Sequence, residues 1–254
     1  MNEVLEFLTD SYNWRGSGGI PTRLLQHLGY SGLALLVAIV IAVPIGAWVG
    51  HTGRGGFLIV GGANGLRALP ELGLLTLLVL AVGIGLLPVV VALAVLGIPP
   101  LLAGTYAGIR NVDRSVVDAA RGMGMRESQV LVKVELPNAL PLIMGGLRAA
   151  ALQVIATAVV AAYVSFGGFG RYLIDGLKSG DNGKAVAGAV LIVVLALVVE
   201  GVLALAQRYV VSPGLRSRGG SRRSPVAEIP TTDSRLQAAV APTDSTPDTV
   251  GAER

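Results

Sequence analysis

The sequence contains no cysteine and only two histidines, His27 and His51, among its 254 residues. Without cysteine there is no disulfide framework and no thiol chemistry, so the redox state of the compartment stays open. Two histidines alone do not make up the ligand set of a metal site. We therefore expect a protein that binds no metal and performs no cysteine-based catalysis.

Charged residues are scarce as well. They make up 14% of the chain, against roughly a quarter in soluble domains, while hydrophobic residues make up 52%. Several apolar runs exceed the ~18 residues that indicate a transmembrane helix. Because a water-soluble core cannot use that much apolar surface, the sequence predicts an all-α polytopic membrane protein.

A nucleotide-binding site is also missing. The nearest match to a phosphate-binding loop ends at Gly183-Lys184, but Ala185 replaces the hydroxyl residue that would bind Mg²⁺. Lys178 stands where the first glycine of that motif should be, and no other group of residues forms a catalytic constellation. We expect a chain that is not an enzyme, holds no cofactor and does not hydrolyse ATP by itself.

The membrane domain is expected at residues 28–210 and to contain about five spans. We place them at 28–50, two within 57–109, 141–164 and 185–209. A helix that began at Phe57 would bury Arg67 by about 15 Å, whereas a start near Leu66 leaves a short apolar stretch. We therefore expect the second span to be broken near Pro70.

Two terminal segments lie outside this domain. Residues 1–27 begin with an acidic amphipathic stretch, which favours an arm at the membrane surface over a cleaved signal peptide. Residues 211–254 are rich in serine, proline, threonine and arginine and have no hydrophobic periodicity. Such a segment cannot bury enough apolar surface to order itself, so we expect a disordered tail.

The loop 110–141 contains the most polar stretch between spans. Asp113 can cap a short helix, and Gly122 and Gly124 can end it. A second helix is expected directly afterwards, with four apolar residues facing inward, namely Val130, Leu131, Val134 and Leu136. The pattern predicts two short helices joined at the glycines. We call residues 113–141 the elbow.

Basic residues are unevenly distributed along the chain. The loops at 51–56 and 110–137 and the near tail hold more lysine and arginine than the loops on the opposite face. The positive-inside rule then places the elbow and the C-terminus in the cytoplasm and the N-terminus outside. We assign the basic charge to membrane orientation and lipid contact, and expect no nucleic-acid partner.

The elbow resembles the EAA loop of ABC importer permeases. Its Asp118-Ala119-Ala120 is followed after three residues by Gly124, and then, nine residues later, by Val134 and the pair Leu136-Pro137. Aspartate and valine replace the usual glutamate and isoleucine of that motif. The resemblance implies that this segment docks on a cytoplasmic ATPase. The residues it would assign to coupling are Asp118, Ala119, Ala120, Arg121, Gly124, Leu136 and Pro137.

Four further stretches resemble permeases for glycine betaine, choline, carnitine or proline. They are NGLRALPELGLLTLLVL, GIPPLLAGTYAGIRNVD, GGLRAAALQ and SFGGFGRYLIDGL, and the resemblance covers about residues 28–210. It implies the type I importer fold and a place in a bacterial plasma (inner) membrane. The implied partners are cytoplasmic ATPase subunits that hold ATP and Mg²⁺, an external substrate-binding protein, and a second permease, identical or paralogous.

Polar residues within the spans are candidates for the transport pathway or a gate. Arg67 and Glu71 stand four apart and can pair on one helix face, which lowers the cost of placing them in a membrane. The alternative is an arginine that snorkels to the surface. The further candidates are Thr105, Tyr106, Gln153, Thr157 and Tyr163, whose alternative role is hydrogen bonding between helices.

Arg148 and Glu200 are two more charges within spans. We expect Arg148 near the inner interface, bonded to carbonyl groups of a span or of the elbow. Glu200 is expected to face protein, and the sequence does not identify the residue that pairs with it.

These features favour one function over two alternatives. The favoured function is the permease subunit of an ATP-driven osmoprotectant importer, because the elbow pattern and the further stretches agree. An importer of another small amino acid is the first alternative, since the elbow serves many substrates. The second is a carrier or an osmotically gated channel that works without ATP.

Overall fold

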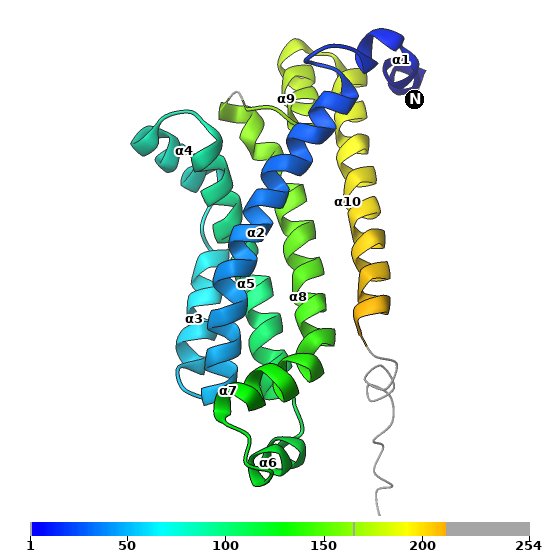
Figure 1. Ribbon diagram of the computed structural model, residues 1–254. Coiled ribbons are helices and arrows are strands. Elements are labelled where there is room, and N and C mark those ends of the chain that lie inside the picture. The colour runs from blue at the N-terminus through cyan, green and yellow to red at the C-terminus, as the bar shows by residue number, and fades with distance from the viewer. Residues whose placement is uncertain (1, 165, 212–254) are drawn as a thin grey trace, which may run out of the picture. The chain divides into compact units, whose positions relative to one another are not determined.

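The computed structural model describes residues 2–164 and 166–211, without the side chains of Asn2, Leu58, Val60 and Asn64. The predicted tail, apart from its first residue, lies outside the described residues, so its disorder stays a prediction. The described chain is helical and contains no strand (Figure 1). Its elements are α1 (Asn2–Thr9), η1 (Ser11–Trp14), α2 (Ile20–Thr52), α3 (Gly56–Arg67), α4 (Glu71–Val82), α5 (Leu86–Arg110), α6 (Arg114–Gly122), α7 (Glu127–Val130), η2 (Leu131–Glu135), α8 (Leu136–Thr157), η3 (Ala158–Val164), α9 (Gly170–Ser179) and α10 (Asn182–Val210).

Four helical segments of the described chain are long and apolar enough to cross a membrane. They are α2, α5, the continuous stretch from α7 to η3, and α10. The second part of α3, Gly61–Arg67, passes the same test together with α4, as a pair bent by 84°. α3 ends at Arg67 and Pro70 precedes the first residue of α4, so the predicted break near Pro70 is confirmed. Proline has no N–H to continue the helical ladder, which explains the position of the break.

Small residues allow α2, α5 and α8 to pack closely. Ala34, Ala38 and Ala42 on α2 are fully buried. A Cβ atom added to Gly104 on α5 would lie 2.8 Å from the Cα atom of Gly146 on α8, so neither position tolerates a side chain without a shift. Lipid is as apolar as these helices, and close contact between backbones therefore supplies much of the attraction between them.

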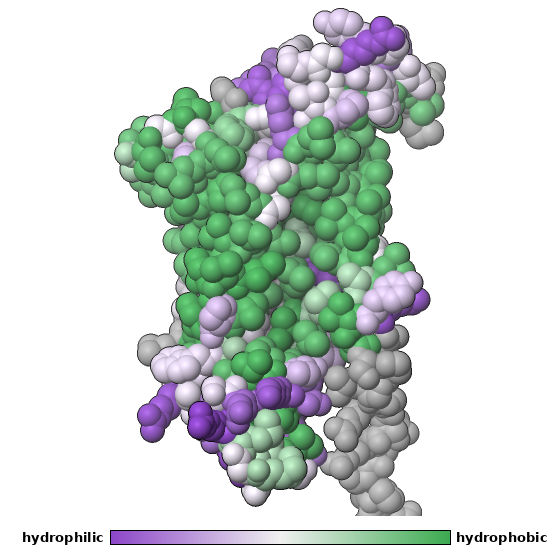
Figure 2. Space-filling model, in the orientation of Figure 1, coloured by the Kyte–Doolittle hydropathy of each residue, from purple (hydrophilic) through white to green (hydrophobic). Residues whose placement is uncertain are grey.

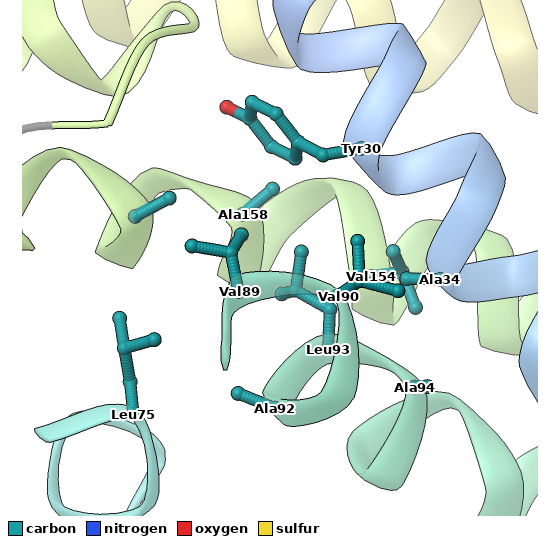
Figure 3. Close-up of a cluster of buried hydrophobic side chains, with 11 residues drawn as sticks. Tyr30, Ala34, Leu75, Val89, Val90, Ala92, Leu93, Ala94, Val154 and Ala158 are labelled. Carbon is teal, nitrogen blue, oxygen red and sulfur yellow. The ribbon is translucent and has the colours of Figure 1, made fainter. Parts of the chain in front are cut away.

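The largest buried cluster draws side chains from most of the membrane helices. Figure 3 shows Tyr30 and Ala34 of α2 facing Val89 and Leu93 of α5, with Leu75 of α4 at the edge of the cluster. This cluster ties the second half of the broken span to the bundle. Hydrophobic residues cover the middle of the molecule in Figure 2, and hydrophilic residues gather near α1 and around the elbow.

The N-terminal arm packs at the end of the helical bundle that lies opposite the elbow. Phe7 of α1 makes an edge-to-face contact with Tyr172 of α9, with ring centroids 5.3 Å apart. A Cβ atom at Gly183, at the start of α10, would lie 2.8 Å from the Cβ atom of Glu3. The arm therefore rests on α9 and α10, and α2 begins within it at Ile20.

Candidate functional site

The first helix of the elbow forms where its capping residues predict. The Asp113 carboxylate accepts a hydrogen bond from the Ser115 amide at 3.0 Å, and α6 ends at Gly122. Gly124 follows with φ +83°, a conformation that favours glycine. These features confirm the predicted start and end of the helix.

One face of α6 packs against the second half of the elbow. Val117 and Ala120 are buried against Val130, which is itself fully buried. The neighbouring Val116 is exposed, because successive residues are turned by about 100° around a helix. Ala120 is 2% exposed and therefore lies inside the elbow, not on its outer surface.

A turn of π-helix joins α7 to α8. In η2 the Leu136 amide donates to the carbonyl group of Leu131, five residues earlier. Pro137 follows in the first turn of α8 and has no N–H to donate. Turns of this kind occur often at functional sites. The sequence did not predict this turn.

Charged side chains connect α6 to the end of α2. Nδ1 of His51 lies 2.6 Å from Oε2 of Glu135, and Nε2 lies 3.1 Å from Oε2 of Glu127. Arg121 donates two hydrogen bonds of 2.9 Å to the same Glu127 carboxylate. Nη1 of Arg121 also lies 3.6 Å from Oδ1 of Asp118. We call His51, Arg121, Glu127 and Glu135 the His51 cluster.

The His51 cluster is buried at one end and exposed at the other. The side chains of His51 and Glu135 are 11% and 7% exposed, whereas those of Arg121 and Glu127 are 43% and 59% exposed. Both ring nitrogens of His51 thus face carboxylate oxygens. The hydrogen bond to Glu127 raises the pKa of Arg121 and keeps that residue charged. Removal of one partner from the buried end would leave a polar group without compensation.

Sequence reasoning missed His51, Glu127 and Glu135 as members of a site. His51 and Glu135 are 84 positions apart, and no local pattern joins them. One pattern in the sequence indicates that Glu135 faces inward. Glu135 follows Leu131 by four residues and therefore shares the inward face that the apolar residues define.

The predicted coupling residues divide into exposed and buried groups. Asp118 and Arg121 line a polar cleft of about 110 Å³ between α6 and the ends of α2 and α5. The exposed members are Asp118, Ala119, Arg121, Gly124 and Pro137. Leu136 is partly buried against Ala47 and Ile109. The elbow thus presents one outer surface, while its inner surface contacts the spans.

A second polar feature lies at the break between α3 and α4. A cavity of about 400 Å³ is lined by Leu66, Arg67, Leu69, Glu71, Leu96, Pro100, Ala149 and Gln153. We call it the Pro70 cavity. Gln153 of α8 donates a hydrogen bond of 3.4 Å to Glu71 of α4.

Arg67 and Glu71 do not form the predicted ion pair. Within the part of the chain that the structure describes, no ion pair joins them, because the helix is interrupted between the two residues. Arg67 lies beside the middle of α5. It shares the cavity with Leu96 and Pro100, and each of these lies about 15 Å from one end of α5 at 1.5 Å per residue.

The remaining pathway candidates are dispersed. Thr105 is fully buried and its hydroxyl donates to Leu101 within α5. Tyr163 is exposed on η3 and is not among the residues that line the Pro70 cavity. Tyr106 is half-buried, and its hydroxyl would lie 2.6 Å from a Cβ atom at Gly56.

Thr157 alone among these candidates adjoins the Pro70 cavity. Its hydroxyl donates to the Gln153 carbonyl group at 2.8 Å. Thr157 and Glu71 together line a smaller space of about 10 Å³. The structure therefore brings together Arg67, Glu71 and Gln153, with Thr157 beside them.

Arg148 and Glu200 prove to be partners. The Arg148 guanidinium on α8 forms an ion pair with the Glu200 carboxylate on α10 and donates to Gln207 at 2.9 Å. The predicted bond from Arg148 to carbonyl groups is therefore replaced by side-chain contacts. It is Gln207 that donates to a carbonyl group, that of Pro141, at 3.3 Å. These contacts hold the last span against the bundle.

A glycine-rich loop is fixed to the other end of α2. The Phe169 amide donates to Nδ1 of His27 at 3.3 Å, and Nε2 lies 3.1 Å from the Ile155 carbonyl oxygen. The Tyr30 hydroxyl donates to the Gly167 carbonyl group, and the Gly168 amide donates to the Gln26 side chain. We call Gln26, His27 and Tyr30, with residues 166–169, the loop clamp.

Comparison with known proteins identifies the chain. A family described as the inner membrane component of binding-protein-dependent transport systems matches residues 32–217. The chain belongs to this family. The match spans the elbow, the Pro70 cavity and residues 166–169 of the loop clamp, and it leaves outside the N-terminal arm and the clamp residues Gln26, His27 and Tyr30.

Several curated members of this inner membrane component family are similar over most of their length. A choline transport system permease protein of Bacillus subtilis, OpuBB, is 31% identical over 85% of this chain and 97% of its own length. A carnitine transport permease protein of Listeria monocytogenes, OpuCB, is 36% identical over 69% of this chain and 80% of its own. An osmoprotectant import permease protein of Salmonella typhimurium, OsmW, is 32% identical over 82% and 99%.

Solved structures give the same fold for this inner membrane component. An inward-facing structure of the MetNI methionine ABC transporter matches with a TM-score of 0.67, at 20% identity, over 76% of this chain and 96% of that one. An amino acid ABC transporter crystallised with histidines matches with a TM-score of 0.61, at 21% identity, over 74% and 92%. The predicted type I importer permease fold is confirmed.

Proposed function

We propose that this chain is the transmembrane permease subunit of an ATP-driven importer of osmoprotectants, with glycine betaine, choline and carnitine ahead of proline. The single observation that carries the proposal is the similarity to permeases of that class over most of both chains. The broken span, the polar cavity and the elbow supply the parts that such a permease needs.

The elbow is the segment proposed to receive the motion of an ATPase. Its outer surface carries Ala119 and Gly124, and Arg121 connects this surface through Glu127 to His51. A displacement of α6 would pull on Glu127 and, through His51, on the end of α2. A short helix that moves as a rigid piece between two spans suits the transmission of a domain closure.

The proposed partners supply what the chain itself does not. Cytoplasmic ATPase subunits hold ATP and Mg²⁺, an external binding protein delivers the substrate, and a second permease, identical or paralogous, completes the pathway. The excess of lysine and arginine around the elbow supports a cytoplasmic position for the elbow and the C-terminus in a bacterial plasma membrane.

The Pro70 cavity is proposed as part of the pathway. Arg67 and Gln153 are exposed in the single chain, yet they lie beside the middle of α5. Charged groups at membrane depth face protein or water and avoid lipid. A second permease that covers this side would enclose the cavity between the two subunits.

Reconstitution tests this function directly. The permease is placed in proteoliposomes with its ATPase and its binding protein, and uptake of labelled glycine betaine, choline, carnitine, proline and leucine is measured with and without ATP. We expect ATP-dependent uptake of at least one osmoprotectant and none of leucine. Uptake of leucine alone would show that the protein belongs to an importer of amino acids. Uptake that does not need ATP would assign it to carriers or channels.

A further inference from the structure

We infer that the Pro70 cavity is a transient binding site for a zwitterionic substrate, with Glu71 facing its ammonium group and Arg67 facing its carboxylate. This inference rests on the proposed function and adds a binding site within the permease itself. The observation behind it is a pair of opposite charges that line one cavity in the middle of a span without an ion pair between them.

The first step of the argument concerns the charge of the cavity. Arg67 and Glu71 are the charged residues among the described side chains that line it, and together they have no net charge. A cation bound there would leave Arg67 without a partner, and an anion would leave Glu71 without one. Unpaired charges away from water are unfavourable, so a ligand with one charge of each sign fits best.

The second step concerns the groups that would contact the ligand. A guanidinium group binds a carboxylate through two parallel hydrogen bonds. The Glu71 side chain is held by Gln153, whose amide donates to it at 3.4 Å, and it keeps further acceptor positions free for a cationic group. Gln153 therefore acts as a positioning residue for Glu71 and also offers a neutral polar group to the ligand.

The third step concerns the strength of binding. No aromatic residue is among the described side chains that line the cavity, so the aromatic cage that holds quaternary ammonium groups tightly is missing. The volume of about 400 Å³ also exceeds what a compact solute of this class fills. A loose, two-point site suits a transport pathway, where a substrate must leave as readily as it enters.

The break between α3 and α4 gives the cavity a way to open. Pro70 separates α3 from α4, and the two helices are bent by 84°. Arg67 therefore belongs to the end of one helix and Glu71 to the start of the next. A change in the angle between α3 and α4 would separate the two charges and weaken a two-point site, which gives a route to release.

Charge-neutralising variants test the site through their effect on different substrates. Uptake of glycine betaine, a zwitterion, and of choline, a cation, is measured for Arg67→Gln and Glu71→Gln with the same ATPase and binding protein. Arg67→Gln is expected to lower kcat/KM for glycine betaine about tenfold and to leave that for choline within about twofold, because choline has no carboxylate. Glu71→Gln is expected to lower both about tenfold.

Arg54→Gln serves as the matched control, because it removes an arginine from the short loop between α2 and α3 outside the cavity. Its ratio of glycine betaine to choline uptake should equal that of the wild type. Equal losses of the two substrates in Arg67→Gln would overturn the inference and leave the proposed function intact. Absence of ATP-dependent uptake by the wild type would instead count against the proposed function.

A direct binding measurement covers the case in which a variant assembles but does not transport. Saturation-transfer NMR on the assembled transporter in detergent, without the binding protein, reports weak binding of glycine betaine and choline. The wild type should show binding of glycine betaine that both substitutions remove. Absence of glycine betaine binding to the wild type, or binding that survives both substitutions, would overturn the inference.

Discussion

At one end of α2 the ring nitrogens of His27 bond to backbone groups, whereas at the other end those of His51 contact two carboxylates. The Phe169 amide can only donate and the Ile155 carbonyl group can only accept, so a neutral ring with its proton on Nε2 satisfies both. The same residue type thus contacts backbone groups at one end of α2 and carboxylates at the other.

The difference separates a fixed end from an end that can change. Backbone groups in the loop clamp have few alternative partners, and their loss would leave buried polar groups unsatisfied. The exposed part of the His51 cluster, Arg121 and Glu127, can exchange its contacts with water at low cost. We therefore expect α2 to stay fixed at the loop clamp while its other end follows the elbow.

The largest expected effect comes from a side chain placed inside the loop clamp. In Gly168→Val a Cβ atom would overlap the Tyr30 hydroxyl, and the residue would have to adopt φ +88°. We expect a loss of roughly 3 kcal/mol or more in stability, and little folded protein. The measurement is the yield and melting temperature of purified protein.

Gly180→Val is the control for that substitution. Gly180 has a similar φ of +72°, but nothing lies within 4 Å of an added Cβ atom. It should lose only the cost of the backbone conformation, about 1–2 kcal/mol. Equal losses at the two positions would show that the clamp contacts add nothing.

A smaller loss is expected at the buried end of the His51 cluster. Glu135→Ala removes the nearer partner of His51 and should lower stability by roughly 3 kcal/mol. The double variant His51→Ala/Glu135→Ala should lose less than the sum of the two single losses, because each removes the same contact. Additive losses would contradict a direct interaction between the two residues.

Gly124→Val is expected to affect coupling more than stability. Nothing lies within 4 Å of an added Cβ atom, so the substitution changes only the backbone preference at φ +83°. The elbow should then adopt a different angle, and ATP-dependent uptake should be lost while the protein stays inserted and assembled. Membrane fractionation, pull-down of the ATPase and vesicle uptake measure these three properties. Uptake at the wild-type rate would rule out a role of this turn in coupling.

The smallest change in stability is expected at the exposed end of the His51 cluster. Arg121→Ala removes an exposed ion pair to Glu127, and such pairs contribute about 0–1 kcal/mol. If Arg121 transmits motion, however, ATP-dependent uptake should fall about tenfold while ATP hydrolysis continues. A melting temperature and uptake that both match the wild type would limit coupling to other residues of the elbow.

Local patterns predicted the elements of this fold well. The cap at Asp113, the glycines that end α6 and the break at Pro70 each depend on neighbouring residues, and each is confirmed. The resemblance around Asp118 and Pro137 led to the correct family because it rests on spacing within a short segment.

Contacts between distant residues escaped prediction. Arg148 pairs with Glu200, which lies 52 positions later in the sequence. No local pattern around either residue indicates the other as its partner. The resemblance placed Ala119 and Ala120 in one motif, and it did not show that Ala120 turns inward while Ala119 stays exposed. Arg67 and Glu71 were expected to pair on one helix, and the proline between them removed that helix. The coupling and pathway roles of these residues stay predictions.

The most direct test compares how the two ends of α2 move during transport. Because the chain lacks cysteine, spin labels can be placed at exposed positions, with Met123 and Trp48 reporting on the elbow end and Leu25 and Leu177 on the loop clamp. Distances are measured by double electron–electron resonance in the assembled transporter, with labelled permease diluted among unlabelled copies. Trapping with ATP and vanadate should shift the Met123–Trp48 distance and leave the Leu25–Leu177 distance unchanged. An unchanged Met123–Trp48 distance, or equal shifts at both ends, would contradict the account.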